Sequence, residues 1–295
     1  AGTWYNIYTR NENACNNQQG EPTMGFLKKF TKQEISWMMY DWANSAHSVI
    51  VVTILPIFFD SVASCTADSV SSMSTWGYAT SIAMAIVALA APFLGVFGDI
   101  RGMRKKLFTA FLLLGVVSVA GLAFTPLMDF TSSTAVAGKV AMLVLVLYIL
   151  STIGFDASCI YYDAFLTDVT TEDRMDKVST MGYGLGYIGG STIPLLIFLI
   201  MNLVGVPMLT CLAFVFGLTA VWWLAFSLPL LKNCEQTSGK PYEKGDVARS
   251  MKGVGTTIKE IIANKPMLIY ILSYFFYIDG VHTVISMATT YGTNL

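Results

Sequence analysis

The sequence predicts an all-α protein that crosses a membrane several times, and three observations support this fold class. Of the 295 residues, 54% are hydrophobic and 13% are charged, whereas about a quarter of a soluble domain is charged. The mean hydropathy is +0.59. Seven segments are long and apolar enough to cross a bilayer as helices. In chain order they cover residues 36–60, 76–97, 107–127, 139–165, 178–204, 207–231 and 266–290.

The basic residues predict the orientation of these segments. Seventeen of the 18 Lys and Arg residues lie before the first segment or in the loops after the second, fourth and sixth, and only Lys139 lies on the opposite side. Because loops rich in Lys and Arg stay in the cytoplasm, the N-terminus and these loops are expected there.

The first segment carries polar residues inside its apolar run. At 100° per residue, Asp41, Asn44, Ser45 and Ser48 form one stripe, with His47 beside it. A charged residue at the centre of a membrane helix costs about 2.5–3.5 kcal/mol on insertion scales, so such residues normally face a bundle interior or a wet cavity. The stripe therefore predicts a helix that lines a pathway.

The turn after the second segment, GVFGDIRGMRKK at residues 95–106, is open to two interpretations. It could be an ordinary basic loop at the cytoplasmic surface. Its spacing also resembles the signature loop of the major facilitator superfamily, which implies a conformational latch between helices. The latch residues would be Gly95, Gly98, Asp99, Arg101, Gly102, Arg104 and Lys105, with Arg174 of a later loop available to pair with Asp99 or Asp163.

The fourth segment carries two carboxylates on one face. Asp156 and Asp163 are seven residues apart, which places them about 20° apart around a helix. Both lie in its inner part, at a depth comparable with Asp41. Asp163 could instead be interfacial and solvated, whereas the deeper Asp156 favours a function or a buried pairing.

The fifth segment begins with glycines at a spacing of four. Gly182, Gly186 and Gly190 form two successive GxxxG steps, which are typical of close helix packing. A dinucleotide site is excluded, because no strand precedes these glycines.

The expected organisation has four parts. A disordered cytoplasmic segment (1–34) precedes a six-helix transmembrane bundle (35–231), a cytoplasmic central loop (232–265) and a seventh helix that starts a second bundle (266–295). Apolar residues at helical spacing over 247–263 predict an amphipathic helix on the inner membrane surface. The segment before Met24 is expected not to belong to the mature protein. The alternative is that it forms a disordered tail.

The five cysteines are scattered without a CxxC pair or metal-ligand spacing, so free thiols and no metal site are expected. They are Cys15, Cys65, Cys159, Cys211 and Cys234.

The seventh segment is similar in sequence to the first. When His282 is set on His47, HTVI aligns with HSVI and Asp279 falls on Asn44. This repeat fits a transporter built from two related six-helix halves, in which the first and seventh helices are equivalent.

Four stretches together resemble one family. YDWANSA, GDIRGMRKK, YDAFLTDVTTEDR with GYGLGYIGG, and YIDGVHTVISMATTYG are similar to the vacuole-effluxer family of major facilitators, which includes an autophagy-related vacuolar amino-acid exporter. The similarity covers residues 35–295. Because that family implies twelve helices, this chain resembles the N-terminal half plus helix seven and is an apparent fragment.

The resemblance implies a secondary transporter that exports amino acids by alternating access, with protons as a candidate coupling ion and a lipid bilayer and a small solute as partners. The solute or proton pathway would be lined by Asp41, Asn44, Ser45, His47, Asp156, Asp163, Asp279 and His282. The alternative is a membrane sensor or assembly partner that keeps the fold. An enzyme is disfavoured because neither HExxH nor GxSxG occurs. No cofactor or nucleic acid is expected, and a bacterial inner membrane is favoured over a fungal vacuole.

Overall fold

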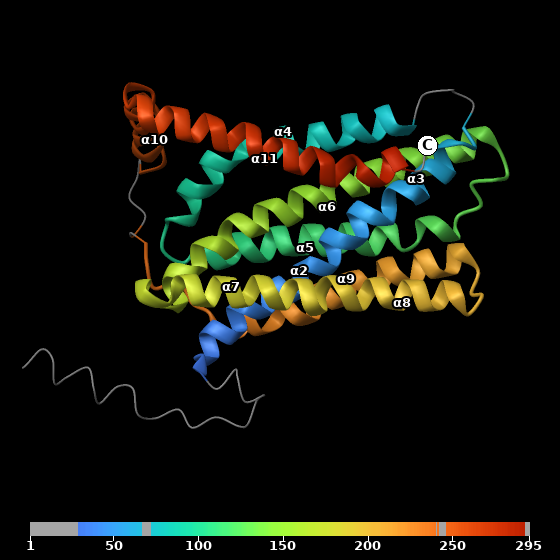
Figure 1. Cartoon of the computed structure of the whole chain (residues 1–295), viewed down its shortest axis with the longest axis horizontal. Helices are drawn as coiled ribbons and strands as arrows, with labels where there is room; N and C mark the ends of the chain where they lie inside the picture. Colours follow the sequence, from blue (N-terminus) through green and yellow to red (C-terminus); the bar gives the residue numbers. More distant parts are fainter. Residues whose placement is uncertain (1–28, 67–71, 240, 242–245, 293–295) are drawn as a thin grey trace, which may run out of the picture. The chain divides into compact units, whose positions relative to one another are not determined.

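The computed structural model describes residues 29–66, 72–239, 241 and 246–292. The chain divides into two compact units, residues 1–31 and 32–295, and the helices that follow belong to the second unit. Every regular element in the described residues is helical (Figure 1). This confirms the predicted fold class.

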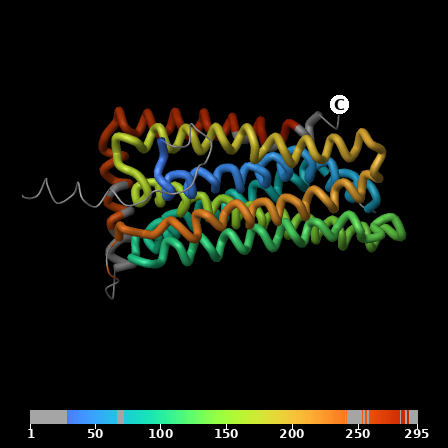
Figure 2. Tube along the Cα trace, turned by 90° about the horizontal axis from the view of Figure 1, so that it is seen from below, coloured from blue at the N-terminus to red at the C-terminus, as the bar shows by residue number. Residues whose placement is uncertain are grey.

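The helices follow one another as α2 (Lys32–Thr53), α3 (Leu55–Ala63), α4 (Ser72–Gly98), α5 (Arg104–Leu122), η2 (Thr125–Leu127), α6 (Thr134–Val169), η3 (Glu172–Arg174), α7 (Met175–Leu185), η4 (Gly186–Ser191), α8 (Thr192–Leu203), α9 (Met208–Asn233), α10 (Asp246–Ala263) and α11 (Lys265–Gly292). Within the described residues, seven helical spans are long and apolar enough to cross a membrane, as predicted. They run along a common direction (Figure 2).

Two of the spans are interrupted where the sequence predicted continuous helices. The first is divided between α2 and α3 next to Pro56, which lacks the N–H that a continuous helix requires. The fifth consists of α7, the π-helical η4 and α8. The glycines of η4 have no side chains, so its backbone lies close to α2. The π-helical turn is wider than a regular α-helical turn.

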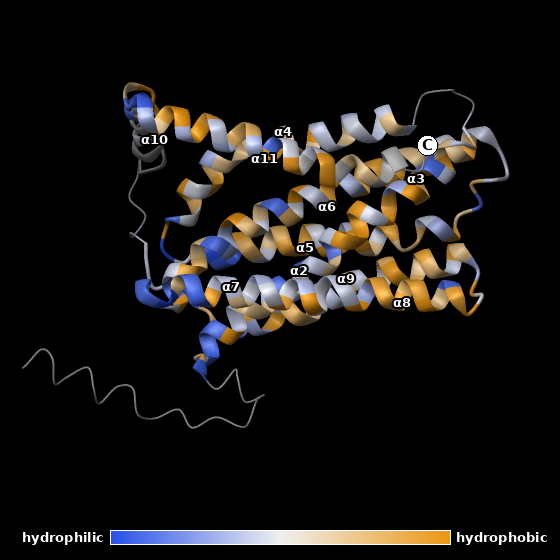
Figure 3. Cartoon of the chain, viewed as in Figure 1, coloured by the Kyte–Doolittle hydropathy of each residue, from blue (hydrophilic) through white to orange (hydrophobic). Residues whose placement is uncertain are grey.

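Polar residues gather at one end of the second unit. In Figure 3 the start of α2 and the turn before α7 are hydrophilic, whereas most of the length of the spans is apolar. The predicted amphipathic helix in the central loop is helical and corresponds to α10. Its position on a membrane surface stays a prediction.

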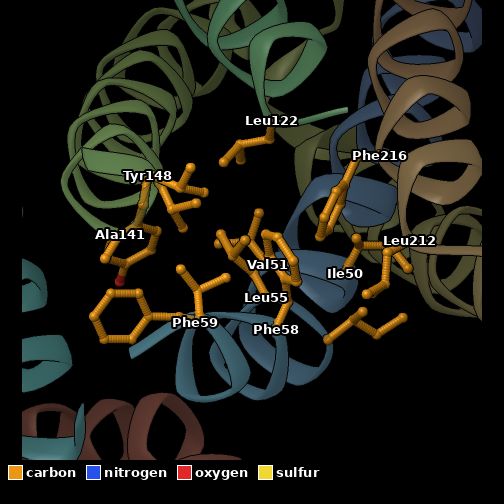
Figure 4. Packing of buried hydrophobic residues seen from close by; sticks show 14 of the residues in the cluster. Ile50, Val51, Leu55, Phe58, Phe59, Leu122, Ala141, Tyr148, Leu212 and Phe216 are labelled. Atoms are coloured by element: carbon orange, nitrogen blue, oxygen red, sulfur yellow. The ribbon is translucent and has the colours of Figure 1, made fainter. Parts of the chain in front are cut away.

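An apolar cluster fills the opposite end. Ile50, Val51, Leu55, Phe58 and Phe59 of α2 and α3 pack among buried residues of α4, α5, α6 and α9 (Figure 4). The contributing parts of these helices are the end of α5 and the starts of α4, α6 and α9, all far along the chain from the basic loops. Burial of this apolar surface holds that end of the bundle together.

Helix α2 packs against α9, α7, η4 and α6, and helices α5 and α6 share the most extensive contact. A Cβ atom on Gly154 would lie 2.5 Å from the backbone nitrogen of Gly115 and 2.8 Å from the carbonyl oxygen of Phe111. Two backbones can approach this closely only where one residue has no side chain.

We predict that Gly154→Ala destabilises the protein, because the added methyl would meet the backbone of α5 rather than a movable side chain. Overpacking of this kind costs about 1–3 kcal/mol. Gly138→Ala in the same helix is the control, since nothing lies within 4 Å of its Cβ position. Thermal unfolding of both purified variants in detergent tests this. Equal midpoints would show that α5 and α6 are less closely packed than described.

Candidate functional site

The polar stripe of α2 lines a cavity of about 370 Å³. The walls come from α2, α6, α7 and η4, all from the parts nearer the basic loops. The lining residues are Trp37, Asp41, Asn44, Ser45 and Ser48 of α2, Phe155, Cys159, Tyr162 and Asp163 of α6, Ser179 and Tyr183 of α7, and Tyr187 and Ser191 of η4. The cavity thus lies away from the apolar cluster.

Asp41 is held in a defined position within this cavity. The hydroxyl of Tyr162 donates a hydrogen bond of 2.8 Å to Asp41 Oδ2. The ring of Tyr162 stacks on Trp37 at 4.3 Å, and Trp37 Nε1 donates to the carbonyl oxygen of Tyr162 at 2.9 Å. Because both Tyr162 and Trp37 are buried, these contacts hold the Tyr162 hydroxyl beside the Asp41 carboxylate.

Glycines let α7 and η4 approach α2 at this point. A Cβ on Gly182 would lie 2.6 Å from Asp41 Oδ2, and one on Gly186 would lie 2.6 Å from Ser45 Oγ. At Gly190 the added atom would lie 2.4 Å from the carbonyl oxygen of Trp42. The three predicted packing glycines therefore face α2, where any larger residue would displace a cavity wall.

The structure brings four of the predicted pathway residues together in the cavity: Asp41, Asn44, Ser45 and Asp163. Asp41 is half-buried and Asp163 is exposed, so Asp163 lies where the cavity is open. Asp163 is thus exposed and part of the lining, while its role in a pathway and its position at the membrane interface stay predictions.

His47 lies outside the cavity lining. Its ring stacks on Phe155 with a centroid distance of 4.8 Å and contacts the ring of Trp223 at a tilt, with a centroid distance of 4.9 Å. Neither ring nitrogen has a hydrogen-bond partner among the described residues, and the side chain is 3% exposed. The one-residue offset from the polar stripe turns the ring into the packed interior, so the structure gives His47 a packing environment.

The other predicted pathway residues also lie apart from the cavity lining. Asp156 is half-buried on α6, and its Oδ2 atom has no partner among the described residues. Asp279 is exposed on α11, a helix that packs sparsely against α2, α3 and α4. The side chain of His282 lies outside the described part of the chain.

The turn between α4 and α5 makes contacts that the sequence did not predict. Arg104 is almost fully buried and forms an ion pair with Asp168 at the end of α6, together with a 2.9 Å hydrogen bond to the carbonyl oxygen of Ala164. Asp99 lies 3.8 Å from Arg104. The basic turn is therefore anchored to α6.

Arg174 does not take the partner that the sequence suggested. It pairs with Glu34, through Nη2 to Oε2 at 2.8 Å and Nε to Oε1 at 2.9 Å, rather than with Asp99 or Asp163. Thr170 donates a further 2.7 Å hydrogen bond to Glu34. The reason is topological, because the start of α2 lies beside the loop between α6 and α7 and buries the Glu34 carboxylate there.

Comparison with known proteins gives the family. The chain matches the model described as "Vacuole effluxer Atg22 like" over residues 30–295. This protein belongs to the Atg22-like vacuole effluxer family.

Among its relatives, the chain is 41% identical over 277 residues to the "Uncharacterized MFS-type transporter YxiO" of Bacillus subtilis (strain 168), which covers 91% of this chain and 62% of that protein. It is 26% identical over 125 residues to "Autophagy-related protein 22-1" of Penicillium rubens, covering 39% of this chain and 21% of that protein. The chain thus spans less than two thirds of the length of these relatives. No solved structure matches it. The matched names describe transport rather than catalysis, as expected.

Several lining residues of this Atg22-like protein were missed from the sequence. Ser179, Tyr183, Tyr187 and Ser191 recur at intervals of four, a spacing that marks one helical face beside the glycine face. That repeat was a usable signal. The role of Tyr162 could not be predicted from the sequence, because its hydroxyl meets Asp41 only where α2 and α6 pack together.

A second feature missed from the sequence is a short strap, defined as residues 234–239, that follows α9. Gln236 Oε1 accepts hydrogen bonds from the backbone N–H groups of Gly102 (2.8 Å) and Arg104 (3.3 Å), and Gln236 Nε2 donates to the carbonyl oxygen of Gly98 (3.0 Å). The backbone N–H groups of Thr237 and Ser238 donate to Asp168 Oδ1 at 3.1 and 2.9 Å. The strap therefore ties the start of the central loop to the predicted latch turn.

Both ends of the strap pack closely against other parts of the protein. Gly239 has a φ of +113°, and a Cβ there would lie 2.8 Å from the carbonyl oxygen of Asp99. Cys234 is buried, and its Sγ donates to the carbonyl oxygen of Gln33 at 3.6 Å. Burial raises the pKa of the Cys234 thiol to about 12. As predicted, the cysteines in the described residues are free; Cys15 lies outside them.

We predict that Cys234 is alkylated slowly at pH 8 and that Gly239→Ala accelerates the reaction. The thiolate is the reactive form, and burial keeps the thiol protonated until the strap is displaced. Peptide-level mass spectrometry after N-ethylmaleimide treatment measures the rate.

The matched control is Gly205→Ala, because Gly205 also has a positive φ, +86°, but nothing lies within 4 Å of its Cβ position. It imposes similar backbone strain without touching the strap. If Gly239→Ala left the alkylation rate of Cys234 at its wild-type value, the strap would not protect this thiol.

Proposed function

We propose that this protein forms part of a secondary transporter that exports small solutes, amino acids first, by alternating access. One observation carries the proposal: an open cavity lined by Asp41, Asn44 and Asp163 lies in one half of membrane-spanning helices whose other half is closed by an apolar cluster. A polar chamber accessible from one side is what a carrier needs in one of its two states. The family name, vacuole effluxer, agrees with transport out of a compartment.

Protons are the proposed coupling ion. Carboxylates inside membrane-spanning segments are typical of proton relays, and Asp41, Asp156 and Asp163 all lie in such segments. We propose a cytoplasmic N-terminus and a bacterial inner membrane, supported by the basic loops and by the bacterial relative. A membrane sensor with the same fold is the second candidate, and it would bind a solute without moving it.

We predict that the full-length protein in proteoliposomes moves labelled leucine, that a pH gradient drives this flux, and that Asp41→Asn reduces it by about tenfold or more. Hydrogen bonds to charged groups contribute about 1.5–3 kcal/mol, which corresponds to such a factor. Asp129→Asn is the control, because Asp129 is an exposed carboxylate in the loop after α5.

Leucine flux that Asp41→Asn leaves unchanged would remove Asp41 from the mechanism. Leucine binding without flux by the folded wild-type protein would favour the sensor. A leucine flux that is the same with and without a pH gradient would contradict proton coupling.

A further inference from the structure

The charged side chains in the described lining of the cavity are all negative. Two of its thirteen lining residues, Asp41 and Asp163, are carboxylates, and the described lining contains no Lys, Arg or His. Both lie in membrane-spanning helices. A carboxylate there is normally paired with a cation, because leaving it unpaired costs free energy. Neither forms an ion pair with any described residue.

The hydrogen bonds leave acceptor positions open. Tyr162 occupies Oδ2 of Asp41, and within the described part of the chain no side chain donates to Asp41 Oδ1 or to Asp163. An ionised carboxylate only accepts hydrogen bonds, so a ligand that meets these oxygens must be a donor. A primary ammonium group offers three N–H donors and a positive charge, and it matches both requirements.

The aromatic walls favour the same charge. The stacked pair of Trp37 and Tyr162 lines one side of the cavity, and Tyr183 and Tyr187 line another with ring centroids 5.0 Å apart. The face of an aromatic ring carries negative electrostatic potential and attracts a cation within about 6 Å. Tyr183 and Tyr187 also bond to each other through their hydroxyl groups at 3.2 Å, which fixes their relative position.

The described lining offers a carboxylate ligand no cationic side chain. The strongest partners of a bound carboxylate are Arg and Lys side chains and the backbone N–H groups of helix N-termini, whereas the Asn, Ser and Tyr side chains of the lining are neutral and weaker donors. The cavity is lined by the middle of α2, the inner part of α6 and successive turns of α7 and η4, whose backbone N–H groups are used within the helices. A ligand carboxylate would also meet the charges of Asp41 and Asp163.

We propose that this cavity recognises the protonated primary amine of its solute, and that the carboxylate of an amino acid is bound outside it. This inference rests on the proposed function, because it assigns one end of the transported solute to the cavity. It leads to a specific selectivity. A primary amine whose carboxylate is masked binds at least as tightly as the amino acid, whereas an amino acid whose amine is masked does not bind.

Calorimetric titration of the full-length protein in nanodiscs tests this with three probes: leucine, leucine amide and N-acetylleucine. We expect leucine amide to bind at least as tightly as leucine, and N-acetylleucine to bind about a hundredfold more weakly or not at all, since it lacks the charge and two of the N–H donors. N-acetylleucine binding as tightly as leucine would overturn the inference.

Variants locate the binding site. Asp41→Asn and Asp163→Asn, which keep the side-chain shape, are each expected to weaken leucine amide binding by about tenfold or more. Asp129→Asn is again the control and should bind like the wild type. Thermal unfolding of each variant confirms that it is folded, and Asp163, being exposed, is the one least able to disturb the fold. Unchanged binding in both folded cavity variants would overturn the assignment.

The titrations and the flux assay test the amine site and amino-acid export independently, so either proposal can be contradicted without the other. If leucine amide binds and both aspartate variants weaken it, but leucine is not transported, the amine site stands and amino-acid export does not. If leucine is transported but N-acetylleucine binds equally well, export stands and the amine site is wrong. A cavity whose carboxylates serve only as proton carriers would give this second result.

Discussion

Close packing of α2 against the glycine face of α7 and η4 is the contact on which the cavity depends. Gly182, Gly186 and Gly190 let the fifth span approach within van der Waals distance of Asp41, Ser45 and the Trp42 backbone. With larger residues the helices would move apart and the tyrosines of α7 and η4 would no longer form a wall beside Asp41. The π-helical turn contributes to the same end, because its glycines meet α2 where a regular helix with side chains would not fit.

Helix α2 also explains why polar and apolar packing are separated along the bundle. Its first half carries Asp41, Asn44 and Ser45 to the cavity, and its second half carries Ile50 and Val51 into the apolar cluster. His47 lies between the two halves, packed against Phe155 and Trp223 without a hydrogen bond to any described residue. The polar cavity and the apolar cluster therefore lie on either side of the buried His47 along α2.

The strap gives the basic turn a structural context. Gln236 replaces three hydrogen bonds that the turn between α4 and α5 would otherwise make with water, and Asp168 joins the strap to Arg104 and to the end of α6. Three helix ends and the start of the central loop thus share one polar network. A conformational latch at this turn stays a prediction, and it would involve this network.

The spans, their polar stripe and the family could all be predicted from the amino-acid sequence. These features are local, because a helix in lipid satisfies its own backbone and its apolar length can be counted. Asp41 was identifiable because helical spacing places it in the polar stripe of the first span, and the packing glycines because the same spacing places them on one face of the fifth span. The three-dimensional arrangement was needed to show that Tyr162 holds Asp41, that Asp163 faces the cavity, that His47 does not, and that Gln236 and Glu34 are the partners of the basic turn and of Arg174. These contacts join residues on different helices, and helical periodicity fixes the angle of a side chain around its own axis but not which neighbour it meets.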